Sequence, residues 1–331
     1  MRRTVRAAAA AASLALAAGL AGCSQPLPVP TPDALPAATP PAMSVEQAER
    51  ILDEVADALA AADVDHATAA LFPRVVGPAA QIRSAEYRLA GLGGDPDAVT
   101  LLTTSPQTIV LPTTDTWPRT MMVVTQQPED LRAPLLLTLV QEAPRAPFAL
   151  WSWARLFPGV VTPELAQPEV GSEPVTPDTT DALVVSPTEV LAQYVDVLTN
   201  RDQSPYAAAF ADDPLRQGIW QTKDRFAEAV GANGTLAETY APGSAGLQAL
   251  ATADGGALVV GTITTTTTIT LTDSTLTIGD QTAVFLGTDT VKSNLSITWA
   301  SVVAFVVPPA GSDAQIQVLG GEHSRIQVTG Q

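Results

Sequence analysis

Two proline-rich segments limit how this chain of 331 residues can fold. Residues 24–43 hold seven prolines, and residues 163–185 hold four prolines and five acidic side chains but no basic one. Proline lacks a backbone N–H and has a fixed φ angle, so we expect neither segment to form a helix or a central strand. The first is expected to be an extended stalk and the second an acidic linker. The rest of the chain forms two parts of ordinary domain size, residues 44–162 and 186–331.

The two parts begin with the same helix-start pattern. Ser44 is followed three residues later by Gln47, and Ser186 is followed by Glu189. This spacing is the capping box, in which the serine oxygen accepts a first-turn N–H and the later side chain accepts the serine N–H. Pro187 at the first helical position strengthens the second start. Apolar residues at spacings of three and four follow each box and predict an amphipathic helix.

Each part then changes from helical to strand patterns. Further helical pieces are expected to end at Phe72 and Phe210, and helices are expected over residues 78–92 and 215–230. Runs rich in β-branched and aromatic residues predict strands over residues 107–111, 119–125, 134–141, 148–157, 257–272, 275–278, 282–286, 295–307 and 315–328. Helices in one block and antiparallel strands in the next predict an α+β fold, with helices packed on one face of a sheet.

This order of elements is similar to that of the NTF2-like, or cystatin-like cone, proteins. In that fold a curved antiparallel sheet wraps around a long helix. The resemblance rests on element order and not on a sequence motif, and it covers most of both parts. It implies a tandem of two diverged α+β domains, residues 44–162 and 186–331. Two unrelated α+β domains with similar helix starts are the alternative.

A short leader precedes the stalk. Three arginines within residues 2–6 are followed by an apolar run over residues 7–20. The run suits a secretory signal and is shorter than the roughly 20 residues that cross a membrane. It closes with Leu20-Ala21-Gly22-Cys23, which resembles the bacterial lipobox.

The lipobox resemblance implies a processing event at Cys23. In that family the cysteine thiol receives a diacylglyceryl group, and the leader, here residues 1–22, is removed. Two acyl chains hold a protein stably on a bilayer, whereas one holds it only marginally. We therefore expect a lipid anchor at Cys23 on the outer face of the cell membrane, with residues 23–43 as the stalk. An ordinary secretory leader with a chance cysteine is the alternative.

The cysteine count limits how the folded part can be stabilised, and the net charge limits which partners it can bind. Cys23 is the only cysteine, so the folded part cannot contain a disulfide and must be stabilised by core burial. The formal net charge is -17 at pH 7. Such a surface repels nucleic acid and anionic membranes. We expect no nucleic-acid partner, and contact with lipid only through the anchor.

The sequence shows no ordered catalytic or metal-binding set. His66 and His323 are the only histidines, a count that excludes a zinc site of the usual composition. Neither a Gly-x-Ser-x-Gly elbow nor a calcium loop is present, so we predict no catalytic residue, metal or cofactor. Asp63, Asp65 and His66 form the densest polar group. We interpret it as a solvated turn in which Asp65 caps the next helix, with acid–base catalysis or cation binding as the alternative.

Aromatic residues are the candidates for pocket lining. Trp151 and Trp153 share one face of a predicted strand, either as core or as the wall of a pocket between sheet and helix. Tyr194 and Trp220 are candidates for the matching role in the second part. The threonine-rich run over residues 262–268 predicts a strand with one hydroxylated face. Ice or carbohydrate binding would need several such strands, and one does not suffice.

These patterns favour a lipid-anchored envelope protein that binds a partner without catalysis. The partner would be another envelope protein or a small apolar ligand. An envelope hydrolase or transferase is the second hypothesis, and clustered carboxylates in a deep polar pocket would support it. A solute-binding lipoprotein of a transporter is the third, although that fold alternates strands and helices around a hinge whereas this chain shows blocks.

Overall fold

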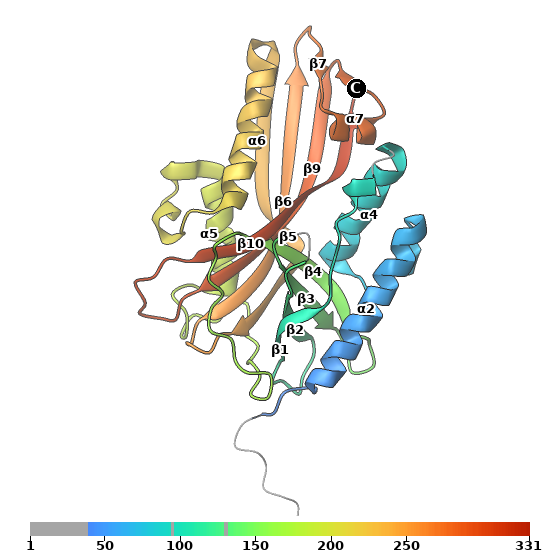
Figure 1. Ribbon diagram of the computed structural model, residues 1–331. Helices are drawn as coiled ribbons and strands as arrows, with labels where there is room; N and C mark the ends of the chain where they lie inside the picture. Colours follow the sequence, from blue (N-terminus) through green and yellow to red (C-terminus); the bar gives the residue numbers. More distant parts are fainter. Residues whose placement is uncertain (1–38, 94–95, 129–131) are drawn as a thin grey trace, which may run out of the picture. The chain divides into compact units, whose positions relative to one another are not determined.

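Blocks of helices and strands follow one another in the computed structural model, which describes residues 39–93, 96–128 and 132–331 (Figure 1). The helices are α2 (Val45–Asp65), α3 (Thr68–Leu71), α4 (Gly77–Gly93), α5 (Pro187–Asn200), α6 (Pro214–Val230) and α7 (Asp280–Leu286). Short 3-10 helices lie at Pro96–Ala98, Arg201–Gln203, Ala207–Ala209 and Gly231–Asn233. The predicted lipidation site, Cys23, and most of the predicted stalk lie outside the described residues.

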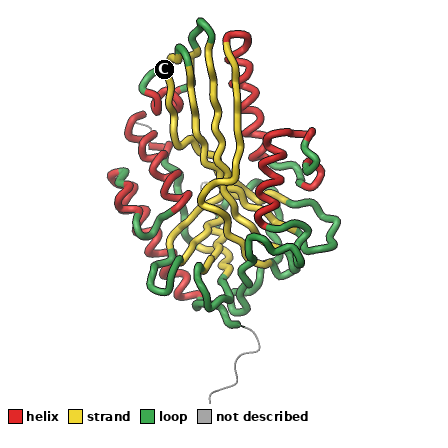
Figure 2. Tube along the Cα trace, turned by 180° about the vertical axis from the view of Figure 1, so that it is seen from behind, coloured by secondary structure: helices red, strands yellow, loops and turns green. Residues whose placement is uncertain are grey.

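Eight strands form one curled antiparallel sheet, a half-barrel (Figure 2). Their order across the sheet is β1-β2-β3-β4-β10-β9-β6-β5, and β7 and β8 form a separate small pair. The strands are β1 (Pro106–Val110), β2 (Arg119–Thr125), β3 (Leu135–Gln141), β4 (Ala149–Leu156), β5 (Gly234–Ala251), β6 (Ala257–Leu271), β7 (Leu276–Thr277), β8 (Thr290–Val291), β9 (Asn294–Val307) and β10 (Gln317–Gly330). The predicted α+β class with an antiparallel sheet is therefore confirmed.

Both predicted capping boxes are present. The Ser44 hydroxyl accepts the Gln47 N–H at 3.3 Å, and the Gln47 side chain accepts the Ser44 N–H at 2.8 Å. At the start of α5 the Ser186 hydroxyl accepts the Glu189 N–H at 3.2 Å, and the Glu189 carboxylate accepts the Ser186 N–H at 3.3 Å. These bonds satisfy N–H groups that would otherwise have no partner inside the helix.

The end of α2 differs from the prediction. Asp65 lies in the last turn of α2, and His66 ends the helix in the left-handed conformation with φ 51°. The next helix, α3, begins at Thr68 with Ala67 as its N-cap residue and has no side-chain cap, so the predicted capping role of Asp65 is wrong. The helix continues further than expected because Ala62 and Leu59 still face the core near its end.

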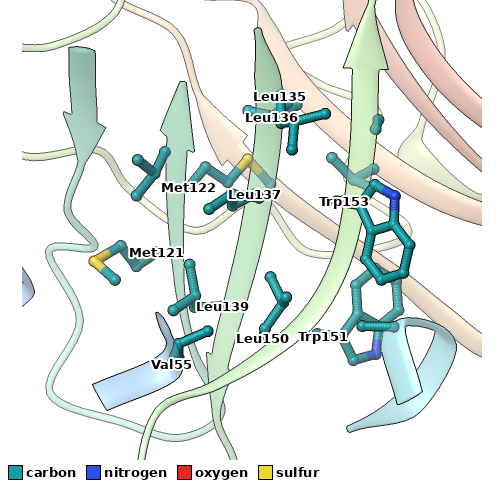
Figure 3. Close-up of a cluster of buried hydrophobic side chains, with 14 of the residues drawn as sticks. Val55, Met121, Met122, Leu135, Leu136, Leu137, Leu139, Leu150, Trp151 and Trp153 are labelled. Atoms are coloured by element: carbon teal, nitrogen blue, oxygen red, sulfur yellow. The ribbon is translucent and has the colours of Figure 1, made fainter. Parts of the chain in front are cut away.

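Three clusters of buried side chains form the core. The first lies between α2, α4 and strands β1–β4 and extends onto β6 and β9; Figure 3 shows part of it, with Val55 of α2 among side chains of β2, β3 and β4. The second lies under α5 and the start of α6, and the third under α7 and the end of α6. Helices thus cover the sheet in separate patches and leave part of it open.

Two elements of the second half were not predicted correctly. Residues 282–286 have strand-forming side chains but lie in α7, where Thr282 and Phe285 are both buried at helical spacing. Gly279 precedes α7 and Gly287, with φ 81°, ends it. The 18-residue strand β5 was missed because alternating polar residues and a bulge between Pro242 and Leu247 interrupt its pattern.

The halves of the chain meet where β4 pairs with β10. Gly320 lies opposite Leu156 and Gly321 opposite Arg155. A Cβ atom at Gly320 would lie 2.3 Å from the Arg155 carbonyl oxygen, so glycine is needed for this approach. Strand β10 runs through both glycines with a bulge after Val318. Strands of both predicted domains therefore share one sheet, and the division into two domains stays a prediction.

The predicted acidic linker hydrogen-bonds to both outer strands of the sheet. Beyond the end of β1, the Ser172 N–H donates to the Leu111 carbonyl at 2.8 Å. At the end of β5, the Ala251 N–H donates to the Glu173 carbonyl at 2.8 Å. We call residues 172–175 the strap. Because it bonds on both sides, the strap connects the two strands that lie furthest apart in the sheet order.

Candidate functional site

The two tryptophans of β4 are packed in the first core cluster. Trp151 and Trp153 are 5% and 0% exposed (Figure 3). Trp151 contacts the first residue of α4, where a Cβ atom at Gly77 would lie 2.9 Å from the indole Cδ1. Gly77 also has φ 55°, so it serves both the turn into the helix and the close approach to Trp151.

The other two predicted aromatics make polar contacts with their tips. The Tyr194 hydroxyl is fully buried and donates to the Asp213 carboxylate at 2.9 Å. Burial and the charge of Asp213 raise the pKa of Tyr194 well above its usual value. The Trp220 N–H donates to the Leu198 carbonyl at 3.0 Å. None of the four aromatic residues lines the two pockets described below, and pocket lining by them stays a prediction.

The Asp63 group is an ion-pair network and not a freely solvated turn. Asp63 accepts from the guanidinium of Arg83 at 2.9 Å and from the Tyr87 hydroxyl at 2.5 Å. The His66 ring stacks on Tyr87 with centroids 5.2 Å apart. Arg83, which is 1% exposed, also donates to Glu86 at 2.9 Å. The network ties α2 to α4, which explains why a dense polar group occurs here.

His323 belongs to a second cluster, on β10. It lies within the strand, opposite Ser301 of β9. Its Nδ1 shares a hydrogen bond of 2.8 Å with the Ser301 hydroxyl. Its ring stacks on Trp299 with centroids 4.7 Å apart, and the guanidinium of Arg325 lies 4.5 Å from the same indole centroid. The sequence did not group these residues because Trp299 and Ser301 lie more than twenty positions before His323 and Arg325.

A polar pocket of about 200 Å³ opens beside this cluster. It is lined by residues of α4, α7, β9 and β10 and of the segment 98–100. Its polar lining consists of Glu86, Thr100, Gln281, Glu322, His323, Ser324 and Arg325. We call it the polar pocket.

An apolar pocket of about 320 Å³ lies on the other side of Arg325. Its wall is formed by α6 and by the segment that leads from β7 into α7. Phe226, Ala229, Leu276 and Ile278 provide most of its apolar surface, and Arg325 closes one side. We call it the apolar pocket.

Arg325 therefore contacts both pockets. Its guanidinium donates to the Gln281 side-chain oxygen at 3.3 Å, and its Nε is buried without a hydrogen-bond partner. Within the described ranges it has no ion-pair partner. Burial lowers the pKa of Arg325 to about 10, so the side chain still carries its charge at neutral pH. A half-buried guanidinium whose Nε is buried without a partner, and which has no carboxylate beside it among the described residues, is incompletely compensated, which is typical of a site that receives an anion.

Burial also shifts the pKa values of the neighbouring titratable groups. Burial, together with the charge of Arg325, lowers the pKa of His323 to about 4, so its imidazole is neutral at physiological pH. Burial raises the pKa of Glu86, against the effect of its hydrogen bonds from Thr100 and Arg83. Both Glu86 oxygens are used in those bonds, at 2.5 and 2.9 Å. Glu86 is thus held by the protein and is not directed at a reacting group.

The cluster does not have the arrangement of a catalytic site. The Ser301 hydroxyl lies beside His323 but is 1% exposed, so a substrate cannot reach it. In the described parts of the chain, no three histidine, cysteine or acidic side chains gather to hold a metal ion. In the same parts of the chain, none of the helices has the length and apolar character needed to cross a bilayer. The cluster thus places the half-buried guanidinium of Arg325 and the His323 imidazole beside the polar pocket.

The fold and site define an α+β half-barrel protein with a cavity beside its central sheet. The chain belongs to the family described as Domain of unknown function (DUF8094), whose model matches residues 39–330. The match includes both halves of the chain and the strap between them. No curated protein and no solved structure matches this chain.

Proposed function

We propose that this protein is a non-catalytic binding protein whose ligand occupies the pockets around Arg325. The observation that carries the proposal is the half-buried side chain of Arg325, which lines two pockets, has a buried Nε without a hydrogen-bond partner, and has no carboxylate partner among the described residues. Ligand sites typically combine apolar walls with a few converging polar groups. The polar and apolar pockets meet that description.

The proposed location is the outer face of the cell membrane, with a lipid anchor at Cys23. Support comes from the charged start, the apolar run and the Leu20-Ala21-Gly22-Cys23 motif. The acidic body, with a formal net charge of -17, favours attachment through acyl chains over contact with anionic lipid.

The proposed evolutionary arrangement is a tandem of two diverged helix-and-sheet units of the NTF2-like kind. The matching capping boxes at Ser44 and Ser186 support it. So does the repeated order, in which helices α2–α4 precede β1–β4 and helices α5 and α6 precede β5–β10.

Two measurements test the proposed function. Cys23→Ala should move the protein from the membrane fraction to the soluble fraction, and continued membrane retention would contradict the anchor.

Protein purified from its own membranes should release a bound small molecule on extraction, as seen by mass spectrometry. The Arg325→Gln variant should release much less of it. Equal amounts from both proteins, or none from either, would contradict a ligand site at Arg325.

A further inference from the structure

We infer that the two pockets bind a single amphiphile, with an anionic head group at Arg325 and a short apolar chain against α6. This inference rests on the proposed binding function and adds the chemical class of the ligand. It follows from the fact that one side chain, Arg325, lines both pockets.

Arg325 determines the charge of the head group. Its Nε is buried and has no acceptor, and its bond to Gln281 is long, at 3.3 Å. A carboxylate can accept two parallel bonds from a guanidinium, which gives both strength and orientation. The ring of Trp299 lies 4.5 Å from the guanidinium carbon and holds the cation in place.

The surrounding carboxylates limit the head group to one negative charge. Glu86 and Glu322 line the polar pocket together with Arg325. One of these carboxylates, Glu86, is paired with Arg83, whereas Glu322 accepts a bond from the Ser324 hydroxyl at 2.9 Å. A doubly charged phosphate would be repelled by Glu322, so a carboxylate fits this pocket better.

The apolar pocket determines the length of the chain. Leu276 and Ile278 are 7% and 6% exposed, and Phe226 of α6 lies opposite them in the pocket wall. At about 30 Å³ for each water-sized group, a volume of about 320 Å³ holds on the order of ten non-hydrogen atoms. The ligand is therefore a medium-chain amphiphile and not a full membrane lipid.

Helix α7 contributes to both pockets. Gln281 lines the polar pocket and the next residue, Thr282, lines the apolar pocket. Gln281 accepts its hydrogen bond from Nη1 of Arg325, at 3.3 Å. The Nε of Arg325, which has no partner, is left to donate to a ligand carboxylate beside Gln281.

The test is a calorimetric titration of the full-length chain carrying Cys23→Ala, in detergent-free buffer. Decanoate should bind, and Arg325→Gln should weaken binding about ten- to a hundredfold, as expected for loss of a charged hydrogen-bond partner. The matched control is Arg119→Gln, since Arg119 also lies over a tryptophan, 4.1 Å from the Trp117 centroid, but far from the pockets. This control should bind decanoate as the parent does.

Further variants test the contact with the head group and the contact with the apolar chain separately. Gln281→Glu places a carboxylate beside Arg325, so it should weaken decanoate binding but leave decanol binding unchanged. Ala229→Trp fills the apolar pocket and should weaken both ligands. Ala227→Trp, at another exposed position of α6, should weaken neither. Circular dichroism confirms that each variant is folded.

The outcomes distinguish this inference from the proposed function. No decanoate binding, or equal binding by the parent and Arg325→Gln, would overturn the inference. Arg325-dependent binding of inorganic phosphate or acetate that is insensitive to Ala229→Trp would also overturn it, because the site would then accept a small anion without a chain. That last result would leave a ligand-binding function at Arg325 intact.

Discussion

Over residues 264–270 of β6 and 294–299 of β9, the two faces of the long-stranded part of the sheet have opposite character, whereas further along these strands both faces are buried. One face lies under α6 and α7 and is buried; we call it the helix face. On this face Ile269 of β6 and Ile297 of β9 are 0% exposed and pack with Phe285 of α7. One of its polar groups makes two hydrogen bonds: the Thr267 hydroxyl donates to Glu238 at 2.6 Å and accepts from the Trp299 N–H at 3.2 Å.

The opposite face has no helix in front of it, as Figure 2 shows for the upper strands; we call it the open face. Thr264, Thr266, Thr268 and Thr270 of β6 lie on it and are exposed or half-exposed. Thr266 is flanked by Thr239 of β5 and Thr298 of β9. The hydroxylated surface therefore extends over at least three strands, more than the single strand that the sequence predicted.

Neighbouring threonines of one strand thus have different roles. Thr267 is buried and holds a charged partner, whereas the side chain of Thr266 makes no hydrogen bond within the described residues. The alternation of a strand, and not the type of residue, decides which role a threonine takes. The following predictions test that difference, from the largest expected effect to the smallest.

Removing a large side chain from the helix face should have the largest effect. Phe285→Ala should lower the free energy of unfolding by about 3–5 kcal/mol, because it leaves a cavity under α7 and removes the stacking of Arg88 on the ring. Thr268→Ala on the open face should change it by less than about 0.5 kcal/mol. Urea denaturation measures the free energy of unfolding of both variants. Similar costs for the two variants would contradict the difference between the faces.

Acid should destabilise the protein through His323. Its pKa is about 4 in the folded protein, below the roughly 6.5 expected when unfolded, so only the unfolded chain binds the proton at intermediate pH. The stabilisation is complete above about pH 6.5 and is lost as the pH falls to 4, up to about 3 kcal/mol.

The variant His323→Gln isolates this contribution to the pH dependence. Glu86 and Glu322 also line the polar pocket. Burial raises the pKa of Glu86, which has the opposite effect on stability as the pH falls. Subtracting the unfolding curves of the variant from those of the parent removes these shared contributions. A difference that does not change between pH 7 and 4 would show that His323 is not buried in its neutral form.

Two adjacent threonines provide the finest comparison. Thr267→Val should cost about 1–3 kcal/mol, because it leaves Glu238 and the Trp299 N–H without their hydroxyl partner. Thr266→Val, which changes the same atoms on the open face, should cost less than about 0.5 kcal/mol or stabilise the strand. Thermal unfolding measures the melting temperatures of both variants, and equal values would contradict the predicted difference between the helix face and the open face.

Local sequence patterns predicted the elements that local interactions determine. The helices starting after Ser44 and Ser186 have capping boxes that use only four neighbouring residues, and both are present. Helix α7 was predicted as a strand because its composition favours β structure, while burial of Phe285 against the third cluster decided the outcome. Strand β5 has few apolar residues to mark it, since one of its faces is open.

The candidate site could not be predicted because it depends on sheet pairing. Arg325 looked like an isolated basic residue, and its contacts with Trp299 and Gln281 come from β9 and α7. Only the register between β9 and β10, which includes a bulge after Arg325, places these side chains together. The sequence does contain one usable signal, the concentration of four polar residues at positions 322–325 within an otherwise apolar strand region.

The strap at residues 172–175 covers one end of each outer strand of the sheet with a single stretch of backbone. Cutting the strap would expose the peptide groups of both Leu111 and Ala251. Exposed strand borders of this kind recruit other chains and promote aggregation. A protease that reached the strap would therefore lengthen the exposed border on both sides of the sheet.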